Sequence, residues 1–98
     1  MNIEGKVALI TGGAHRVGKA ITMELAQKGA DVIINYNQSK DMALTTAQEA
    51  ETLGVRAITK KANVANREEV STMISESEEL LGPIQILINS ASFFAKTK

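Results

Sequence analysis

The sequence contains no cysteine, a single histidine and a single proline. Without cysteine the chain cannot form disulfide bonds or thiolate metal sites, and one histidine cannot build a histidine-based metal cluster, so we expect no metal. Long apolar runs are also missing, as is a basic segment followed by an apolar leader. We therefore expect a cytoplasmic protein with no membrane-spanning helix and no secretion signal.

An excess of charge of either sign is absent as well. The 11 Lys and Arg residues balance the 11 Asp and Glu residues, and the basic ones are scattered along the chain. Nucleic-acid binding needs clustered positive charge, so we expect no nucleic-acid partner. A length of 98 residues suits one domain with one core, and we expect a single domain over residues 1–98.

Short apolar runs alternate with stretches of helical periodicity. The predicted strands cover Lys6–Thr11, Asp31–Asn35, Arg56–Lys60 and Ile84–Asn89. The predicted helices cover Val17–Lys28, Ser39–Leu53 and a third segment that starts after Asn66 and stops at Gly82. Their apolar faces are predicted as Val17, Ala20, Ile21 and Leu25, then Ala43, Leu44, Ala47, Ala50 and Leu53, then Val70, Met73, Ile74, Ser77 and Leu81.

The order of these elements predicts the fold. Asn66, with Glu69 three residues later, resembles a capping box at the start of the third helix. Strands that alternate with helices of this length form a parallel sheet with right-handed crossovers. We predict an α/β fold, the N-terminal half of a Rossmann-type doubly wound parallel sheet (βαβαβαβ) with strand order 3-2-1-4.

A glycine-rich loop joins the first predicted strand to the first helix. It reads Thr-Gly-Gly-Ala-His-Arg-Val-Gly over residues 11–18. Such a loop places free backbone N–H groups and the positive end of a helix dipole at one point, which favours a diphosphate. Gly12 and Gly13 suit a tight turn, and Gly18 suits close packing of the helix on the strand. The alternatives are a glycine turn without ligand and a Walker-type ATP loop, whose Gly-Lys-Ser/Thr is missing because Ala20 follows Lys19.

Three motifs in this order resemble the signatures of the short-chain dehydrogenase/reductase family, over essentially the whole chain. They are Thr-Gly-x5-Gly at 11–18, Asn-Val at 63–64 and Asn-Ser-Ala-Ser at 89–92. The chain departs from the family by carrying Arg16 in place of the middle glycine and Ser90 in place of a second Asn. Arg16, Ser92 and Phe94 resemble the pteridine reductase branch, in which the Phe stacks on the pterin ring.

The resemblance implies a set of binding residues. For the cofactor it implies Gly12, His15, Arg16, Val17, Gly18, Tyr36, Asn37, Ser39, Asn63, Val64, Asn89, Ser90 and Ala91. For the substrate it implies Arg16, Ser92 and Phe94. For some of these residues the alternative is that they bind no ligand. His15 would then be an exposed loop residue, Asn63 the end of a strand, and Phe94 with its neighbour Phe93 core or interface residues.

The residues after the second strand indicate which nicotinamide cofactor is bound. NAD enzymes of this architecture hold the ribose 2′-hydroxyl with an acidic residue there, and Tyr36 takes that position. Asn37, Ser39 and Lys40 offer hydrogen-bond donors and Arg16 can reach the same region, so we predict NADP(H). The alternative is that Asn37 and Ser39 only form a turn and cap the second helix.

The catalytic groups of the family are missing. Hydride transfer to a carbonyl needs a proton donor, which the family supplies as Tyr-x-x-x-Lys supported by a Ser. The only tyrosine, Tyr36, does precede Lys40 at this spacing, but the pair follows the second strand, at the adenosine end of the cofactor. We therefore assign no catalytic residue and predict that the 98-residue chain has no turnover by itself.

These motifs leave three functional hypotheses. The first is the NADPH-binding part of a reductase for a small carbonyl or pterin-like substrate, truncated after the fourth strand and tetrameric at full length. The second is a fragment of a 3-oxoacyl-acyl-carrier-protein reductase, and the third is a non-catalytic nucleotide-binding module. Under all three the fourth strand, with Ile86, Leu87 and Ile88, is an unpaired edge, so we expect marginal stability.

Overall fold

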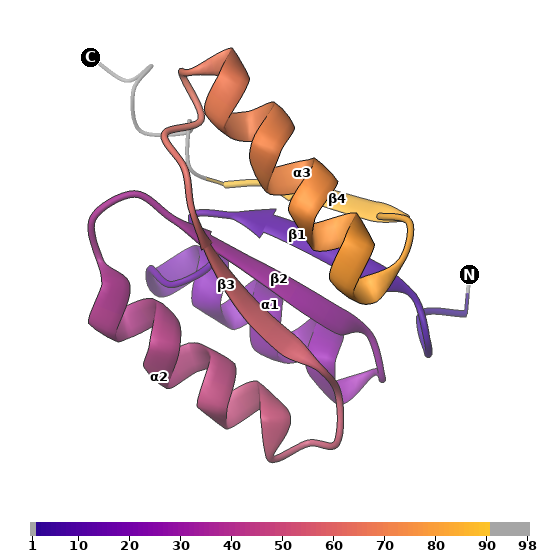
Figure 1. Ribbon diagram of the computed structural model, residues 1–98. Coiled ribbons are helices and arrows are strands. Elements are labelled where there is room, and N and C mark those ends of the chain that lie inside the picture. The colour runs from indigo at the N-terminus through magenta and orange to yellow at the C-terminus, as the bar shows by residue number, and fades with distance from the viewer. Residues whose placement is uncertain (1, 91–98) are drawn as a thin grey trace.

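The chain forms a four-stranded parallel sheet with helices on both faces (Figure 1). The computed structural model describes residues 2–90. In chain order the elements are β1 (Val7–Thr11), α1 (Arg16–Gln27), β2 (Asp31–Tyr36), α2 (Lys40–Glu51), β3 (Ala57–Lys61), α3 (Arg67–Leu81) and β4 (Ile86–Asn89). The strand order is β3-β2-β1-β4, which confirms the predicted doubly wound α/β fold.

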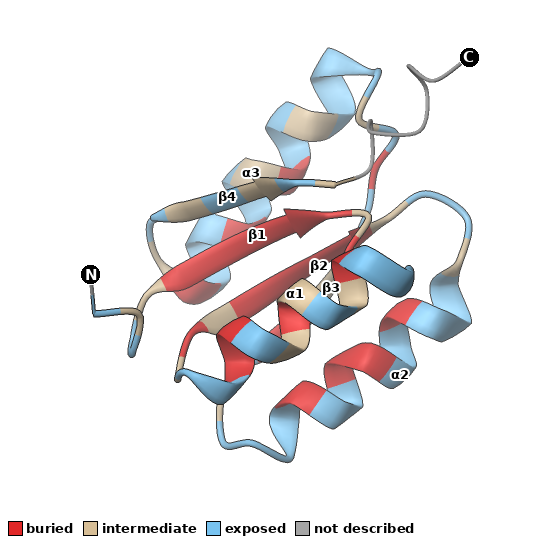
Figure 2. Cartoon of the chain, turned by 180° about the vertical axis from the view of Figure 1, so that it is seen from behind, coloured by how far each residue is buried: buried red, intermediate tan, exposed pale blue. Residues whose placement is uncertain are grey.

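Two apolar layers lie on opposite faces of the sheet, because successive residues of a strand point to opposite sides. On one face Ile10 and Ile34 pack with residues of α1 and α2, among them Leu25 and Ala47. On the other face Leu9 and Ile33 pack with Met73 and Leu81 of α3. Every residue of β1 is buried, as Figure 2 shows, so the strand that leads into the glycine loop runs through the middle of the molecule.

The inward face of α1 differs from the sequence prediction. Val17 is 58% exposed and Ala20 is exposed as well, whereas Gly18, Thr22, Leu25 and Ala26 are buried. The hydroxyl of Thr22 donates to the carbonyl oxygens of Gly18 (2.8 Å) and Gly13 (3.3 Å). This polar residue can face inward because the two carbonyl groups satisfy its hydroxyl, so the buried face of α1 includes a residue that the apolar pattern leaves out.

In α2 the prediction placed two leucines on the wrong side. Leu44 and Leu53 are 42% and 43% exposed. The buried residues of α2 are Ala43, Thr46, Ala47 and Ala50. These side chains are small, so the helix lies close to the sheet and the face that contacts it is narrower than the apolar pattern suggests. In α3 the predicted face is confirmed: Met73, Ser77 and Leu81 are buried, and Val70 and Ile74 are half-buried.

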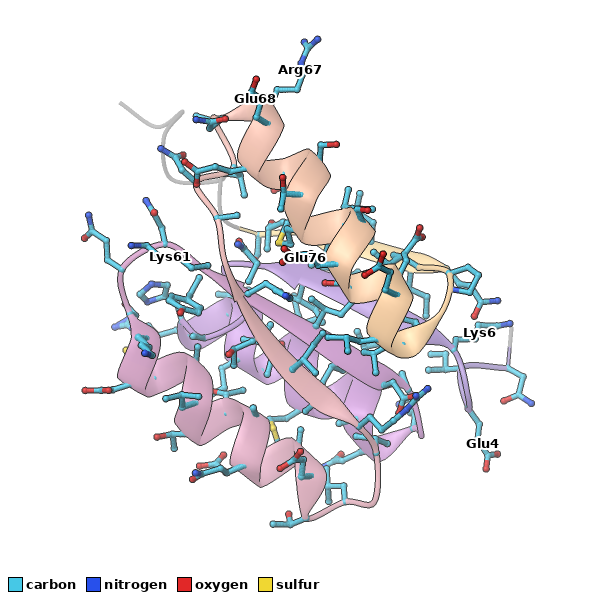
Figure 3. The ribbon with its side chains drawn as sticks, in the orientation of Figure 1. Glu4, Lys6, Lys61, Arg67, Glu68 and Glu76 are labelled. Atoms are coloured by element: carbon cyan, nitrogen blue, oxygen red, sulfur yellow. The ribbon has the colours of Figure 1, made fainter. Side chains whose placement is uncertain are left out.

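The two ends of the sheet carry different charged residues (Figure 3). Lys61, Arg67 and Glu68 lie at the carboxyl edge of the sheet, where the strands end, and Glu4 and Lys6 lie at the amino edge, where the strands begin. The loops after β1, β2 and β3 and the last residue of β4 all lie at the first of these edges, which is where parallel sheets of this kind bind ligands. Within residues 2–90, no helix is long and apolar enough to cross a membrane.

Candidate dinucleotide-binding site

The glycine loop is packed directly against the first turn of α1. Gly12 has a positive φ of 66°. A Cβ atom on Gly18 would lie 2.0 Å from the carbonyl oxygen of Gly12 and 3.0 Å from the Cα of Gly13. The close approach is therefore to the loop backbone beyond the strand, a refinement of the predicted packing on the strand itself. Nothing larger than glycine fits at position 18 without moving the loop.

The start of α1 has no side chain that neutralises its dipole. The N-cap residue His15 is extended and makes no capping hydrogen bond, and no acidic residue lies in the first turn. The first N–H groups of a helix lack partners within it, so those of Arg16, Val17 and Gly18 remain as donors. By contrast, the side chain of Asn66 caps α3. The start of α1 thus has the properties of an anion-binding site.

Asn35, for which the sequence motifs predict no role, connects three strand ends. Its side chain is 2% exposed, and its Oδ1 accepts from the N–H of Gly12 (3.2 Å). Its Nδ2 donates to the carbonyl oxygens of Ala62 (3.1 Å) and Lys60 (3.3 Å). Its own carbonyl accepts from the N–H of Gly13 (3.1 Å). A polar residue that ends an otherwise apolar run is the sequence signal that could have identified it.

The loop from β2 to α2 lies against the glycine loop. Ser39 is the N-cap residue of α2, but its side chain makes no capping hydrogen bond. Its Oγ instead lies 3.3 Å from Nε2 of His15. Asn37 is exposed beside it, and Tyr36 is half-buried as the last residue of β2, one residue further than the strand was predicted to run. The structure thus brings two predicted cofactor residues together.

The loop after β3 is held by its own hydrogen bonds. Oδ1 of Asn63 accepts from the N–H of Ala65 (2.9 Å), as expected for a residue that ends a strand in a turn. The capping box is only half formed: Asn66 accepts from the N–H of Glu69 (3.1 Å), whereas the Glu69 carboxylate accepts from the N–H of Asn63 (2.7 Å) and not from that of Asn66. Asn63 is exposed and Val64 is half-buried.

The end of β4 is joined to the end of β1. Thr11 Oγ1 donates to Oδ1 of Asn89 (2.9 Å) and accepts from the N–H of Ser90 (3.0 Å). The hydroxyl of Ser90 donates to the Thr11 carbonyl. Three residues of the predicted site, Ala91, Ser92 and Phe94, lie outside the described residues, as does Phe93. In residues 2–90 no cluster of acidic and histidine side chains is arranged to hold a metal ion.

Comparison with known proteins identifies similar sequences. Residues 6–98 match a family model described as short chain dehydrogenase. The chain is 38% identical over 96 residues to a 2-dehydro-3-deoxy-D-gluconate 5-dehydrogenase of Formosa agariphila, covering 98% of this chain and 36% of that protein. It is 38% identical over 86 residues to a 3-oxoacyl-[acyl-carrier-protein] reductase of Staphylococcus epidermidis, covering 88% and 35%. The chain thus spans about a third of the length of these two relatives.

One relative is of similar length. A short-chain dehydrogenase/reductase homolog of Bacillus subtilis is 39% identical over 92 residues, covering 94% of this chain and 84% of that protein. Among solved structures, a short chain dehydrogenase from Burkholderia cenocepacia in complex with NADP has a TM-score of 0.88 at 38% identity, covering 93% of this chain and 37% of that one. A blue fluorescent protein from a metagenomic library, in complex with NADPH, has a TM-score of 0.84 at 36% identity, covering 89% and 36%.

Proposed function

The chain belongs to the short chain dehydrogenase family, and we propose that it is the NADPH-binding part of a reductase. Residues 1–98 would form the dinucleotide-binding domain of that enzyme. The bound cofactor supplies the hydride, and the residues of this chain hold and orient it. The observation that carries the proposal is the close contact of Gly18 with Gly12 beside a helix start that has no capping side chain.

This contact explains how the chain would bind a diphosphate. Because position 18 has no Cβ, the first turn of α1 approaches the loop closely. The free N–H groups of that turn and the helix dipole then face the same small region, where a diphosphate would be stabilised. A Walker-type loop would need a lysine followed by Ser or Thr, and Ala20 follows Lys19 here.

Hydrogen-bond donors at the end of β2 favour NADPH over NADH. Tyr36 occupies the position where an acidic residue would bind the ribose 2′-hydroxyl and repel a 2′-phosphate. Ser39 and His15 lie in contact, and Arg16 is exposed next to His15 at the same edge of the sheet. A planar, permanently charged guanidinium is well suited to a phosphate. The solved relatives that carry NADP and NADPH support the same assignment.

Replacement of Arg16 tests this assignment. We expect Arg16→Ala to weaken binding of NADPH by about tenfold or more, because a charge-assisted contact to the 2′-phosphate is lost, and to leave NADH binding almost unchanged. Titration calorimetry with both nucleotides measures the difference. Arg67→Ala is the matched control, since Arg67 is an exposed arginine at the start of α3 on the same edge (Figure 3). Equal loss of NADPH and NADH binding in Arg16→Ala would refute the assignment.

For the substrate we propose a small pterin-like molecule. Support comes from Arg16 in the glycine loop together with Ser92 and Phe94 in the sequence. The similarity to the Staphylococcus epidermidis protein favours a second candidate, a 3-oxoacyl-[acyl-carrier-protein] reductase. A folate analogue titrated into the NADPH-loaded protein separates the two, because only a pterin site would bind it.

The catalytic acid of the proposed reaction is not Tyr36. This residue ends β2 and is half-buried at the adenosine end of the proposed cofactor site. We propose that the acid, the tetramer contacts and the rest of the substrate pocket belong to a full-length enzyme in the cytoplasm. A non-catalytic nucleotide-binding module is the alternative, and the short Bacillus subtilis homolog is the observation in its favour. NADPH oxidation by a homogeneous 98-residue chain would contradict the prediction that this chain has no turnover.

A further inference from the structure

We propose that Asn35 is a positioning residue that fixes the glycine loop in the conformation that binds the cofactor, an inference that rests on the proposed function. The side chain touches no part of the surface where a nucleotide would lie, because it is 2% exposed. Its side chain contacts the loop from the interior of the protein, where it accepts a hydrogen bond from the N–H of Gly12. Its backbone carbonyl accepts a second one from the N–H of Gly13. One residue of β2 therefore determines where both glycines lie.

An asparagine is required here because the site needs an acceptor at one end and donors at the other. Oδ1 faces an N–H of the loop, and Nδ2 faces the carbonyl oxygens of Ala62 and Lys60, 3.1 and 3.3 Å away. Lys60 lies in β3 and Ala62 directly follows its last residue, so the amide also connects the glycine loop to the neighbouring strand. Aspartate would place a negative charge against two carbonyl oxygens, and leucine would leave the buried partners without hydrogen bonds.

The same contacts decide which backbone groups remain for the cofactor. The N–H groups of Gly12 and Gly13 both donate to Asn35 and are not available to a diphosphate. The anion is then bound by the first turn of α1, where Arg16 and Val17 have N–H groups without partners in the helix. The N–H groups of the two glycines thus fix the loop through Asn35, and the N–H groups at the start of α1 are left to bind the ligand.

Amide exchange in the wild-type chain tests this division without a mutation. NMR should show that the Gly12 and Gly13 amides exchange slowly both without and with NADPH, and that NADPH shifts the amide signals of Arg16 and Val17 more than theirs. Fast exchange of the Gly12 amide would overturn the inference even if NADPH binds. No binding of any nucleotide would instead overturn the proposed function, so the two failures are distinguishable.

Two variants then test the side chain itself. We expect Asn35→Leu and Asn35→Asp to weaken NADPH binding by at least about tenfold at temperatures where circular dichroism shows them folded. In Asn35→Leu the Gly12 amide should exchange faster while the amide of Ile10, in the strand before it, changes little. Asn66→Asp is the matched control: it adds the same charge at the same edge, and aspartate is as good an N-cap as asparagine.

The controls separate a positioning role from a purely structural one. If Asn35 only stabilised the fold, the folded fraction of each variant would bind NADPH with wild-type affinity, and that result would overturn the inference. An equal loss of binding in Asn66→Asp would also overturn it, since added charge anywhere on this edge would then explain the effect. Unchanged binding in Asn66→Asp together with a loss in both Asn35 variants supports it.

Discussion

At the scale of single residues, the site depends on the missing Cβ atom of one glycine. Gly18 has no Cβ, and an added one would lie 2.0 Å from the Gly12 carbonyl oxygen. Backbone atoms cannot move aside as the end of a flexible side chain can. The helix start and the loop therefore stay in contact only with glycine at this position.

We predict that Gly18→Ala destabilises the chain by about 1–3 kcal/mol, because the methyl group forces the loop and α1 apart, and that it abolishes detectable NADPH binding. Urea denaturation and calorimetry measure the two effects. Ala20→Ser adds one heavy atom at an exposed position of the same helix and should change stability by less than about 0.5 kcal/mol. A Gly18→Ala variant as stable as wild type would show that the loop adapts and would contradict the prediction.

The residues of the site divide into those that the sequence could reveal and those that it could not. Gly12, His15 and Gly18 lie in one short motif, so their proximity follows from the chain itself. Asn35 lies 23 positions from Gly12 and bonds to it only because β1 and β2 are neighbours in the sheet. Ser39 has the sequence features of a helix cap, yet its hydroxyl lies against His15, a contact that the fold alone creates.

At the scale of elements, one ion pair fixes the start of β2 against the start of β3. Asp31 accepts from the backbone N–H of Arg56 (2.8 Å) and from its Nε and Nη2 (3.0 and 2.7 Å). The next residues along, Val32 and Ala57, are the first pair of the β2–β3 register. Oδ1 accepts from the backbone N–H and Oδ2 from the guanidinium, so the carboxylate holds both the main chain and the side chain of Arg56 and supports the register.

We predict that Asp31→Ala costs about 1–2 kcal/mol of stability, since it removes three hydrogen bonds from a side chain that is only 14% exposed. Thermal or urea unfolding measures the change. The control is Glu24→Ala, which breaks the exposed pair of Glu24 with Lys28, 2.6 Å apart. Lys28 lowers the pKa of Glu24, but solvent screens such a pair, so its loss should leave the unfolding midpoint within experimental error. Equal effects of the two variants would show that the Asp31 contact is no stronger than a surface pair.

The elements themselves followed from the sequence, and their buried faces followed only in part. Each strand begins and ends within two residues of its predicted bounds. Hydrophobicity predicts burial of Val17, Ala20, Leu44 and Leu53 on the inner faces of α1 and α2, but all four are exposed. Tight packing selected small residues there instead, and hydrogen bonding allowed Thr22 and Thr46 to be buried.

At the scale of the whole molecule, β4 has β1 on one side and no other strand beside it among residues 2–90. Leu87 in the middle of β4 is 63% exposed, the largest value among the exposed large hydrophobic residues that the structure describes, and Leu80 near the end of α3 is 59% exposed. An unpaired strand with an exposed leucine favours pairing with another chain. The prediction of marginal stability rests on this edge.

We predict that the 98-residue chain associates with itself as its concentration rises, and that Leu87→Lys reduces this association while changing stability by no more than about 0.5 kcal/mol. Analytical ultracentrifugation measures the association. Leu53→Lys is the control, because Leu53 is exposed beyond the end of α2, away from β4. A wild-type chain that stays monomeric at all concentrations, or an equal effect of both variants, would contradict the prediction.

The sequence by itself determined the order of strands and helices, the glycine loop and the family, because apolar periodicity and short motifs are local properties of the chain. The tertiary structure decided how the loop is held and which backbone donors remain for a ligand. Those features depend on contacts of the glycine loop with β2 and with the start of α2 that no local pattern encodes: the Gly12 and Gly13 bonds to Asn35, and the contact of Ser39 with His15. The physical reason is that a buried polar group must find its partner wherever the fold places one.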